Sequence, residues 1–363
     1  MELDAPSPDS GWSNEILTCL QAIIVPPVTS KMRQEAGIFF PDGKYCAHGE
    51  TWRDNKKMTS RPDVVPDVER TLSGRWLWCG SLFDHFGHFL VESVSRLWAV
   101  DQLGDNLDGL CFIPKRAHRS DGLLRFQAGV LTAFGLDLPV HIAKETTQVD
   151  ELIVPGQGFG LGDVITGTAE MRQAFHKRFG RDILPEGPER LYISRSGLDA
   201  RAGGIIGEQE LERLLQNEGY TVFHPQDHDI ATQIARFKAA QKVIIADGSA
   251  GHLFAHVGRN DQDVAYILRR TYWADGPIQH IESFCEKRPM IIDQIRREWH
   301  PHDRKKHHGV SFVQHDLPDM QEKLITGQFI EKGTIWPEIT NDFAISFLRL
   351  NNLADDFSPT FNQ

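Results

Sequence analysis

The 363-residue chain has little of several features that would place it in a specialised class. Its five cysteines lie far apart and form no Cys-x-x-Cys pair, so neither a disulfide framework nor a zinc ribbon is expected. The apolar run AIIVPPV (22–28) is short and broken by two prolines, whereas a membrane-spanning helix needs about 20 apolar residues. The start, MELDAPSPDSGW, is acidic and polar, unlike a secretory signal. These absences predict a cytoplasmic protein.

Acidic residues outnumber basic ones, with 50 Asp and Glu against 39 Lys and Arg. The formal net charge is −11 at pH 7, which argues against nucleic acid as a partner. The chain is 40% hydrophobic and 25% charged, as in globular proteins that bury a core. Its length suits two domains of about 150 to 180 residues each.

Predicted strands and helices alternate along most of the chain. In the second half, short apolar runs at 190–194, 220–225, 242–247 and 263–268 are separated by helical patterns. The helices are predicted at 207–219, 229–241 and 249–257. In the first half, a strand at 75–83 leads into a predicted helix at 84–100. Such alternation is typical of parallel, doubly wound sheets, so we expect two α/β domains with a cleft between them and a linker at 178–189.

The stretch VIIADGSAGHLFAHV (243–257) predicts a strand, a tight turn and a helix start. One interpretation is a phosphate site, because the first backbone N–H groups of a helix have no intrahelical partner and the helix dipole favours an anion there. Gly248, Ser249 and Ala250 would let a diphosphate approach the backbone, and His252 could donate to it. Another interpretation is a turn in which small residues serve only packing.

A third interpretation makes Ser249 the nucleophile of a serine hydrolase. A nucleophile elbow has the pattern Gly-x-Ser-x-Gly, and here Gly251 fits but Asp247 stands at the first glycine position. Asp293 and His300 are downstream residues that could complete a triad, although other pairs are equally available. The pattern therefore favours a hydrolase less than a phosphate site.

Two arginines follow the strand at 190–194. Arg195 comes directly after its end, where ligands of parallel sheets bind, and a guanidinium is well suited to phosphate. Arg201 lies in the next loop, where a solvated side chain is an equally good interpretation.

The predicted helix at 84–100 carries chemistry on one face. At 100° per residue, His85, His88, Glu92 and Ser95 share a stripe. A carboxylate in a cleft can act as a general base, and a neighbouring imidazole can orient it. A metal site would need a third ligand that is not evident, and a solvent-exposed His–Glu pair is the remaining alternative.

Three blocks of the chain resemble glycosyltransferase family 61, formerly a domain of unknown function. The blocks are HFLVESVSRL (88–97), RLYISRSG with the arginine of the next loop (190–201), and the region through Gln233 to ADGSAGH (246–252). The resemblance covers about 75–270. The chain departs from the family at Asp247, where many members have His, and at Leu253, where Asn is frequent.

The resemblance implies a GT-B-like fold of two Rossmann-like domains and inverting transfer from a nucleotide-sugar, usually a UDP-sugar. It implies Glu92 as the catalytic base with His88 beside it. The diphosphate would be held, without a metal or other cofactor, by Arg195, Arg201, Gly248, Ser249, Ala250 and His252. Supporting roles fall to His85, Asp247 and Gln233.

The resemblance also implies which part of the chain forms each domain. Residues 1–185 would form the acceptor-side domain and 186–315 the donor domain. Residues 316–363, with a predicted helix at 337–352, would pack back on the first domain.

The acceptor would be a glycan or lipid-linked hydroxyl in surface polysaccharide synthesis, with peripheral contact to the inner face of the membrane. A basic stretch at 296–309 is a solvated loop or a contact for an anionic acceptor. The alternatives are a serine hydrolase using Ser249 and a non-catalytic nucleotide-sugar-binding module; the oligomeric state is not indicated.

Overall fold

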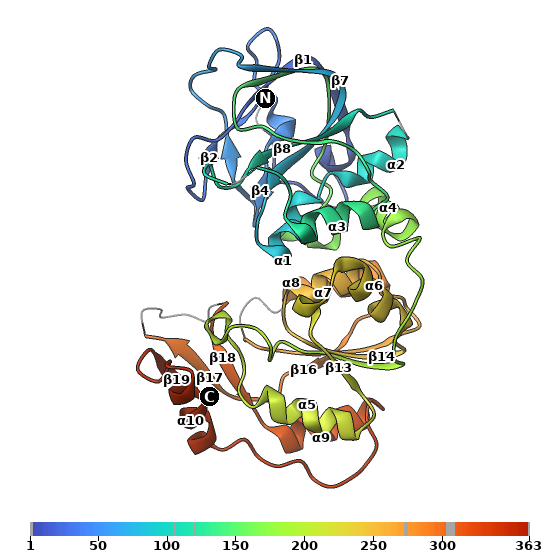
Figure 1. The fold of residues 1–363 in the computed structure, drawn as a ribbon, viewed down its shortest axis with the longest axis vertical. Helices are drawn as coiled ribbons and strands as arrows, with labels where there is room; N and C mark the ends of the chain where they lie inside the picture. Colours follow the sequence, from blue (N-terminus) through green and yellow to red (C-terminus); the bar gives the residue numbers. More distant parts are fainter. Residues whose placement is uncertain (1–2, 105, 120, 272–274, 303–308, 362–363) are drawn as a thin grey trace. The chain divides into compact units, whose positions relative to one another are not determined.

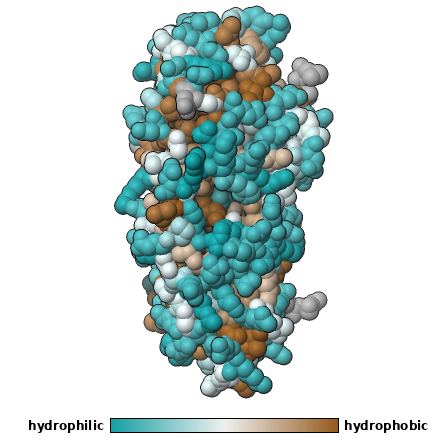
Figure 2. Space-filling view, turned by 90° about the vertical axis from the view of Figure 1, so that its right-hand side faces the viewer, coloured by the Kyte–Doolittle hydropathy of each residue, from teal (hydrophilic) through white to brown (hydrophobic). Residues whose placement is uncertain are grey.

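The computed structural model describes residues 3–361 apart from 105, 120, 272–274 and 303–308. The chain divides into two compact units, Met1–Asp182 and Ile183–Gln363 (Figure 1). Both are mixed α/β structures, which confirms the α/β part of the predicted fold class; the GT-B-like arrangement stays a prediction. Among the described residues no helix has the length and apolar character needed to cross a bilayer. Figure 2 shows a mostly hydrophilic surface on one face, with small apolar patches.

The first unit is built on a six-stranded sheet with the order β3-β1-β10-β7-β8-β9. Its strands are β1 (Ile16–Val25), β3 (Gly37–Phe39), β7 (Arg70–Leu82), β8 (Gly109–Pro114), β9 (Val140–Ile142) and β10 (Thr147–Pro155). β10, β7, β8 and β9 pair in parallel, whereas β1 is antiparallel to both of its neighbours. Because Leu82 pairs with Pro114, β7 and β8 end at the same edge, and the residues that follow them come together.

Shorter elements complete the first unit. Its helices are α1 (Phe86–His88), α2 (Val100–Leu103), α3 (Arg125–Ala133) and α4 (Ala169–Arg178). Two short ladders join β2 (Gln34–Glu35) with β6 (Thr59–Ser60) and β4 (Trp52–Arg53) with β5 (Lys56–Lys57). Buried side chains of the sheet, among them Ile24, Trp78 and Leu152, form one core cluster, which gives the unit its hydrophobic stabilisation.

The second unit contains a five-stranded, fully parallel sheet with the order β13-β11-β14-β15-β16. Its strands are β11 (Arg190–Ile193), β13 (Thr221–Phe223), β14 (Lys242–Ala246), β15 (Asp263–Ile267) and β16 (Met290–Ile292). Numbered along the sheet's own strands, this is the order 2-1-3-4-5 of a doubly wound fold. The winding reverses between β11 and β14, and ligands of such sheets bind at the carboxyl ends of the strands there.

Helices cover both faces of this sheet (Figure 1). α6 (Ile230–Ala239), α7 (Ser249–Ala255) and α8 (Asp275–Cys285) lie on one face, and α5 (Glu208–Asn217) and α9 (Leu317–Thr326) lie on the other. Asp229 is the N-cap of α6, because its side chain accepts a hydrogen bond from Thr232 N at 2.8 Å.

The C-terminal part of the chain packs within the second unit. It adds α10 (Asn341–Leu350) and a four-stranded sheet of β12 (Gly204–Ile205), β18 (Phe312–His315), β17 (Ile295–Pro301) and β19 (Phe357–Phe361). Ala344 and Leu348 of α10 join a core cluster with Tyr192 and Leu211. This differs from the expectation that the C-terminal helix packs on the first domain, because the apolar face of α10 is buried among second-unit side chains. The basic stretch at 296–309 contributes β17; its residues 303–308 lie outside the described part.

Candidate functional site

A hydrogen-bonded carboxylate–imidazole pair follows β7. His88 Nδ1 lies 2.7 Å from Glu92 Oε2. His88 ends α1, and Glu92 lies in the π-helical turn η3 (Phe89–Ser93). Ser93 Oγ fastens this turn to the strand end, donating to Ser81 O at 2.9 Å and accepting from Phe83 N at 3.0 Å. Such π-helical turns are rare and occur frequently at functional sites.

The predicted regular helix at 84–100 is wrong in detail. The segment consists of α1, the π turn, a 3-10 turn (Leu97–Ala99) and α2. A π turn carries an extra residue, so the spacing of 100° per residue does not apply along the segment. Glu92 is 1% exposed and Ser95 is buried, whereas His85 is exposed. The alternative of a solvated His–Glu face is therefore excluded, since the carboxylate lies inside the unit.

Arg53 is a member of this site that the sequence analysis did not identify. Its Nε and Nη2 each lie 2.7 Å from one of the two oxygens of Glu92, a forked pair that fixes the carboxylate plane. Asp54 and Asn55 both have positive φ (47° and 59°), as a tight hairpin turn between β4 and β5 requires. The turn thereby presents Arg53 at the end of β4. The guanidinium also lies over the Phe83 ring, 5.2 Å from its centroid.

The electrostatics of this site favour an ionised Glu92. Burial alone raises the pKa of Glu92, but the hydrogen bonds from His88 and Arg53 and the charge of Arg53 outweigh it, so its pKa lies below the usual value. A carboxylate with a lowered pKa and both oxygens engaged is a poor proton acceptor. The His88 side chain is 35% exposed. When its Nδ1–H donates to Glu92, Nε2 keeps a lone pair, so the imidazole is the better base.

In the second unit, charged residues gather at the carboxyl edge of the parallel sheet. Arg195 follows β11, Asp247 follows β14, and Arg269 and Arg270 follow β15. These three strands are neighbours, and the reversal of winding lies between the first two. The sheet thus brings three guanidinium groups to the place where its topology predicts a ligand.

Arg195 lies directly against the turn before α7. A Cβ added at Gly248 would come within 2.4 Å of Arg195 Nη1, so only glycine leaves room for the guanidinium. The backbone itself does not demand glycine, because φ of Gly248 is 176°. The backbone N–H of Arg195 donates to the buried carboxylate of Glu208 at 2.8 Å. Arg195 Nε is buried and has no hydrogen-bond partner among the described residues, which leaves a donor for an anionic ligand.

Asp247 is the acidic residue that pairs with the arginines at this edge of the sheet. It is fully buried and accepts hydrogen bonds from Tyr266 Oη at 2.8 Å and Arg270 Nε at 3.0 Å. Burial raises the pKa of Asp247, but the charges of Arg270 and Arg269 outweigh it and hold the pKa below its usual value. Arg269 donates to the backbone carbonyl of Asp247, and burial lowers its pKa to about 10. The charges of Arg270, Arg269 and Arg195 thus converge on Asp247, and each of them lowers its pKa. The sequence analysis did not identify Arg269 or Arg270.

The structure places His252 in a different environment from the one predicted. Its Nδ1 lies 3.0 Å from Nδ1 of His280 on α8, and the side chain is largely buried. His256 also packs on His280, with ring centroids 4.6 Å apart. His252 is thus part of the packing between α7 and α8, which does not support the predicted role in binding diphosphate.

The remaining predicted residues occupy varied positions. Ser249 and Ala250 begin α7 and are half-buried. Arg201 is exposed in the 3-10 turn η6 (Ala200–Ala202), and Arg195 Nη2 lies 3.5 Å from Ala202 O in the same turn. Gln233 donates to Pro225 O at 2.8 Å and His228 O at 3.0 Å, which holds the loop between β13 and α6.

The hydrolase alternative finds no support in the positions of its proposed partners. Asp293 forms an ion pair with Lys323 at 2.5 Å. His300 Nδ1 lies 3.0 Å from Ser311 Oγ. Both are thus engaged by residues other than Ser249. Within the described ranges no group of three or more His, Cys, Asp or Glu side chains is arranged to hold a metal ion.

A single family model covers residues of both sites. Residues 86–256 match the family Glycosyltransferase 61, which confirms the resemblance seen in the sequence. The matched segment contains His88, Glu92, Arg195 and Asp247 and leaves out Arg53. No curated protein matches the chain. Over this segment the chain is similar to glycosyltransferases, which indicates a transferase that acts on a donor and an acceptor.

Proposed function

We propose that this chain is an inverting glycosyltransferase whose donor is a nucleotide-diphosphate sugar, specifically a UDP-sugar. Its acceptor would be a hydroxyl of a glycan or lipid-linked glycan in surface polysaccharide synthesis. The family match over 86–256 supports the transferase class. The observation on which the proposal depends most is the 2.7 Å hydrogen bond between His88 Nδ1 and the buried Glu92.

The first unit supplies the base in this proposal. The sequence analysis assigned that role to Glu92, and the burial and pairing of Glu92 now favour His88. The Nε2 atom of His88 accepts the proton of the acceptor hydroxyl as its oxygen attacks the anomeric carbon. Glu92 remains ionised, orients the ring and stabilises the imidazolium that forms, while Arg53 holds the carboxylate in place.

The second unit binds the donor in this proposal. As the bond from the acceptor oxygen to the anomeric carbon forms, the bond to the diphosphate oxygen breaks and its electron pair passes to the diphosphate. One displacement of this kind inverts the anomeric centre. Arg195 and its neighbours stabilise the negative charge that develops, and fixed guanidinium groups at a partly desolvated edge are well suited to this. These charges make a divalent metal dispensable in the proposal.

The test is a calorimetric titration with UDP, GDP, CDP and CMP, each with and without EDTA. The proposal expects one nucleoside diphosphate, UDP in first place, to bind the chain, to bind Arg195→Ala more weakly and to be unaffected by EDTA. The sugar derivative of the nucleoside diphosphate that binds should then be hydrolysed slowly in the absence of an acceptor. Absence of binding to every nucleotide would contradict the donor assignment. Binding that is lost in EDTA would contradict the metal-independent part alone.

A further inference from the structure

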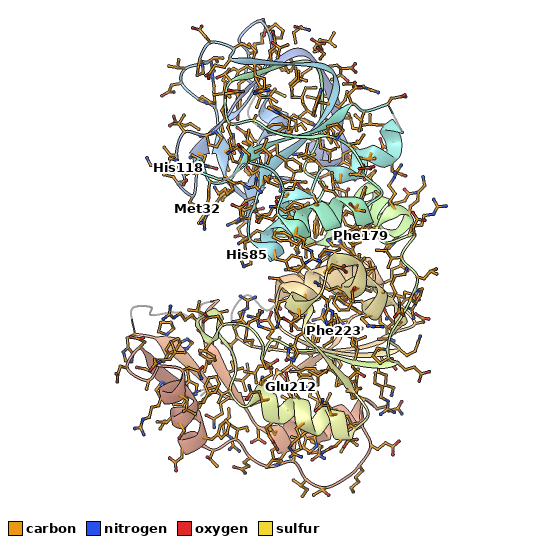
Figure 3. The ribbon with its side chains drawn as sticks, in the orientation of Figure 1. Met32, His85, His118, Phe179, Glu212 and Phe223 are labelled. Atoms are coloured by element: carbon orange, nitrogen blue, oxygen red, sulfur yellow. The ribbon has the colours of Figure 1, made fainter. Side chains whose placement is uncertain are left out.

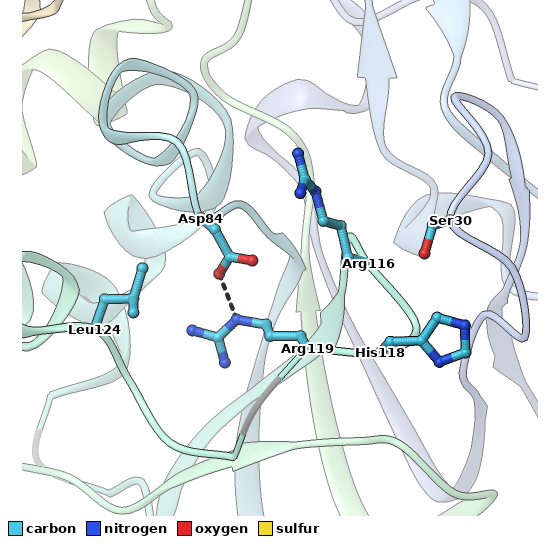
Figure 4. A pocket seen from close by; sticks show the side chains of 6 residues that line it. All are labelled: Ser30, Asp84, Arg116, His118, Arg119 and Leu124. Atoms are coloured by element: carbon cyan, nitrogen blue, oxygen red, sulfur yellow. Dashed lines mark hydrogen bonds and ion pairs between the residues drawn. The ribbon is translucent and has the colours of Figure 1, made fainter. Parts of the chain in front are cut away.

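A pocket of about 670 Å³ opens in the first unit beside the segment that carries His88. It is lined by Ser30, Asp84, Arg116, His118, Arg119 and Leu124 (Figure 4). Asp84 lies two residues after the end of β7, and Arg116 lies two residues after the end of β8. The pocket therefore belongs to the edge at which these two neighbouring parallel strands end.

The pocket carries unbalanced positive charge. Arg119 is buried and pairs with Asp84 at 2.5 Å, so these two charges offset each other. Arg119 also donates to Gly122 O and to Gln127 Oε1, at 2.7 and 2.8 Å. Arg116 and His118 are exposed, and among the described residues neither side chain has a hydrogen-bond or ion-pair partner. An anion that enters would meet one unpaired guanidinium and one imidazole.

The walls of the pocket are held in place before any ligand binds. Lys115 Nζ crosses from the β8 side to the opposite loop, donating to Met32 O at 2.5 Å and to Lys31 O at 3.2 Å. Ala117 N donates to Ser30 Oγ at 3.1 Å. A preformed pocket binds with less loss of conformational freedom than a mobile loop would.

The same loop joins the pocket to the His88–Glu92 pair. Met32, labelled with His85 and His118 in Figure 3, has its sulfur 3.9 Å from Arg53 Nη1. Burial lowers the pKa of Lys115 to about 8, and the charge of Arg53 adds to this effect. Ser30 lines the pocket, and Met32, two residues further along, contacts Arg53, so one loop borders both the pocket and the His88–Glu92 pair.

We propose that this pocket binds an anionic group, a carboxylate or a phosphate, on the acceptor whose hydroxyl is deprotonated by His88. This inference rests on the proposed function and names the acceptor class as an acidic glycan. Arg116 would form the charge-assisted hydrogen bond, and His118, two residues along the same segment, would line the pocket beside it. The ion pair of Arg119 with Asp84 would serve as the floor and would not itself be available to the ligand.

The test measures binding of three sugars to the full chain by titration calorimetry in the absence of donor. The probes are methyl glucuronoside, methyl glucoside 6-phosphate and uncharged methyl glucoside. The chain is compared with Arg116→Ala, Arg116→Lys, Arg61→Ala and Arg195→Ala. Arg61 is exposed in the same unit and does not line the pocket, so it controls for a general loss of positive charge.

The proposal expects at least one anionic sugar to bind more tightly than the uncharged sugar. Loss of a charge-assisted bond should weaken that binding about tenfold or more in Arg116→Ala, with partial recovery in Arg116→Lys. Arg61→Ala should bind as the unaltered chain does, whereas weaker binding by Arg195→Ala and not by Arg116→Ala would assign the anion to the donor site and contradict the inference. The two anionic probes distinguish a carboxylate from a phosphate acceptor.

Equal binding of all three sugars, or equal loss in Arg61→Ala and Arg116→Ala, would overturn the inference. Because these titrations need no turnover, they separate this inference from the proposed function. Selective binding of an anionic sugar without any transfer activity would support the pocket as an anion site and contradict the proposed function. Transfer to anionic acceptors that is unaffected by Arg116→Ala would support the function and contradict the assignment of the pocket.

Discussion

Arg53 holds both carboxylate oxygens of Glu92, with two N–O distances of 2.7 Å, although the two residues lie far apart in the sequence. Glu92 is almost completely inaccessible to solvent. Its second partner, His88, contacts Oε2 through Nδ1, and the His88 side chain is 35% exposed. The arrangement orders three groups by role: a cation that fixes an anion, an anion that fixes an imidazole, and an imidazole that can exchange a proton.

Removing Arg53 should destabilise the first unit. Arg53→Ala leaves a buried carboxylate without its cation, and breaking a buried pair costs about 3–5 kcal/mol. Arg70→Ala is a matched control, because the pair of Arg70 with Glu145 is exposed on both sides (51% and 38%). An exposed pair of this kind contributes about 0–1 kcal/mol. Urea unfolding of both variants measures the difference. Equal losses would show that the Arg53 pair is no more than a surface ion pair.

Arg53→Lys separates stability from positioning. A lysine keeps the charge but cannot hold both oxygens of Glu92 in one plane. We expect the transfer rate at saturating substrate to fall about tenfold, with little change in KM, because orientation rather than binding is lost. Steady-state kinetics on a folded variant, verified by circular dichroism, measure this. A rise in KM at unchanged kcat would place Arg53 in substrate binding instead.

Glu92 should make stability depend on acid pH. Its pKa is lower in the folded chain than the ordinary value of 4.5, so its ionised form stabilises the fold. That contribution is present above the ordinary value and is lost as the pH falls through the lowered pKa of the folded state. The difference in unfolding free energy between the chain and Glu92→Gln should therefore shrink between neutral and acid pH. A difference that grows toward acid pH would have the wrong sign for this environment.

Glu208 in the second unit should behave in the opposite way. Burial raises its pKa, although hydrogen bonds from Arg195 N, Tyr192 and Ser194 partly oppose this. A raised pKa in the folded state means that stability is greatest below the ordinary value and falls as the pH rises through the folded value. Glu208→Gln, whose amide oxygen can still accept these bonds, should thus gain stability relative to the unaltered chain as the pH rises. Thermal unfolding at several pH values measures this; a relative loss of stability would contradict it.

Gly248→Ala should resemble Arg195→Ala in donor binding. The added Cβ would lie 2.4 Å from Arg195 Nη1 and displace the guanidinium, although the backbone conformation suits alanine. Loss of a hydrogen bond to a charged group corresponds to about 10-fold to 100-fold in affinity. Calorimetry with UDP measures both single variants and the double variant. If the two act through one contact, the double variant is no weaker than Arg195→Ala; additive losses would show two separate effects.

The sequence predicted most of the second unit because its signals are local. Apolar runs predicted the strands, and helical patterns at 207–219 and 229–241 predicted α5 and α6. The carboxyl edge of the sheet was predicted from topology, which placed Arg195 and Gly248 together. The first 70 residues were not interpretable, because β1 pairs with β10 and nothing near β1 in the sequence specifies that partner.

The residues that complete the sites depend on distant contacts. The Asp54–Asn55 turn marks a hairpin in the sequence, but no local pattern connects Arg53 to Glu92. Arg269 and Arg270 follow a strand as Arg195 does, and the same rule applied to β15 would have identified them. The spacing of His252 from the turn says nothing about α8, so the contact of its ring with His280 could not be predicted from the sequence.

The most direct test of the central claim compares His88→Ala with Glu92→Gln in the transfer reaction, with and without added imidazole. If His88 is the base, His88→Ala should lose about 10²–10⁴ in kcat while nucleotide binding is unchanged. Imidazole in solution should restore part of that loss. It should not restore Glu92→Gln, in which His88 is present but wrongly oriented. Near-normal transfer by His88→Ala, together with complete inactivity of Glu92→Gln, would contradict the account and return the role of base to Glu92.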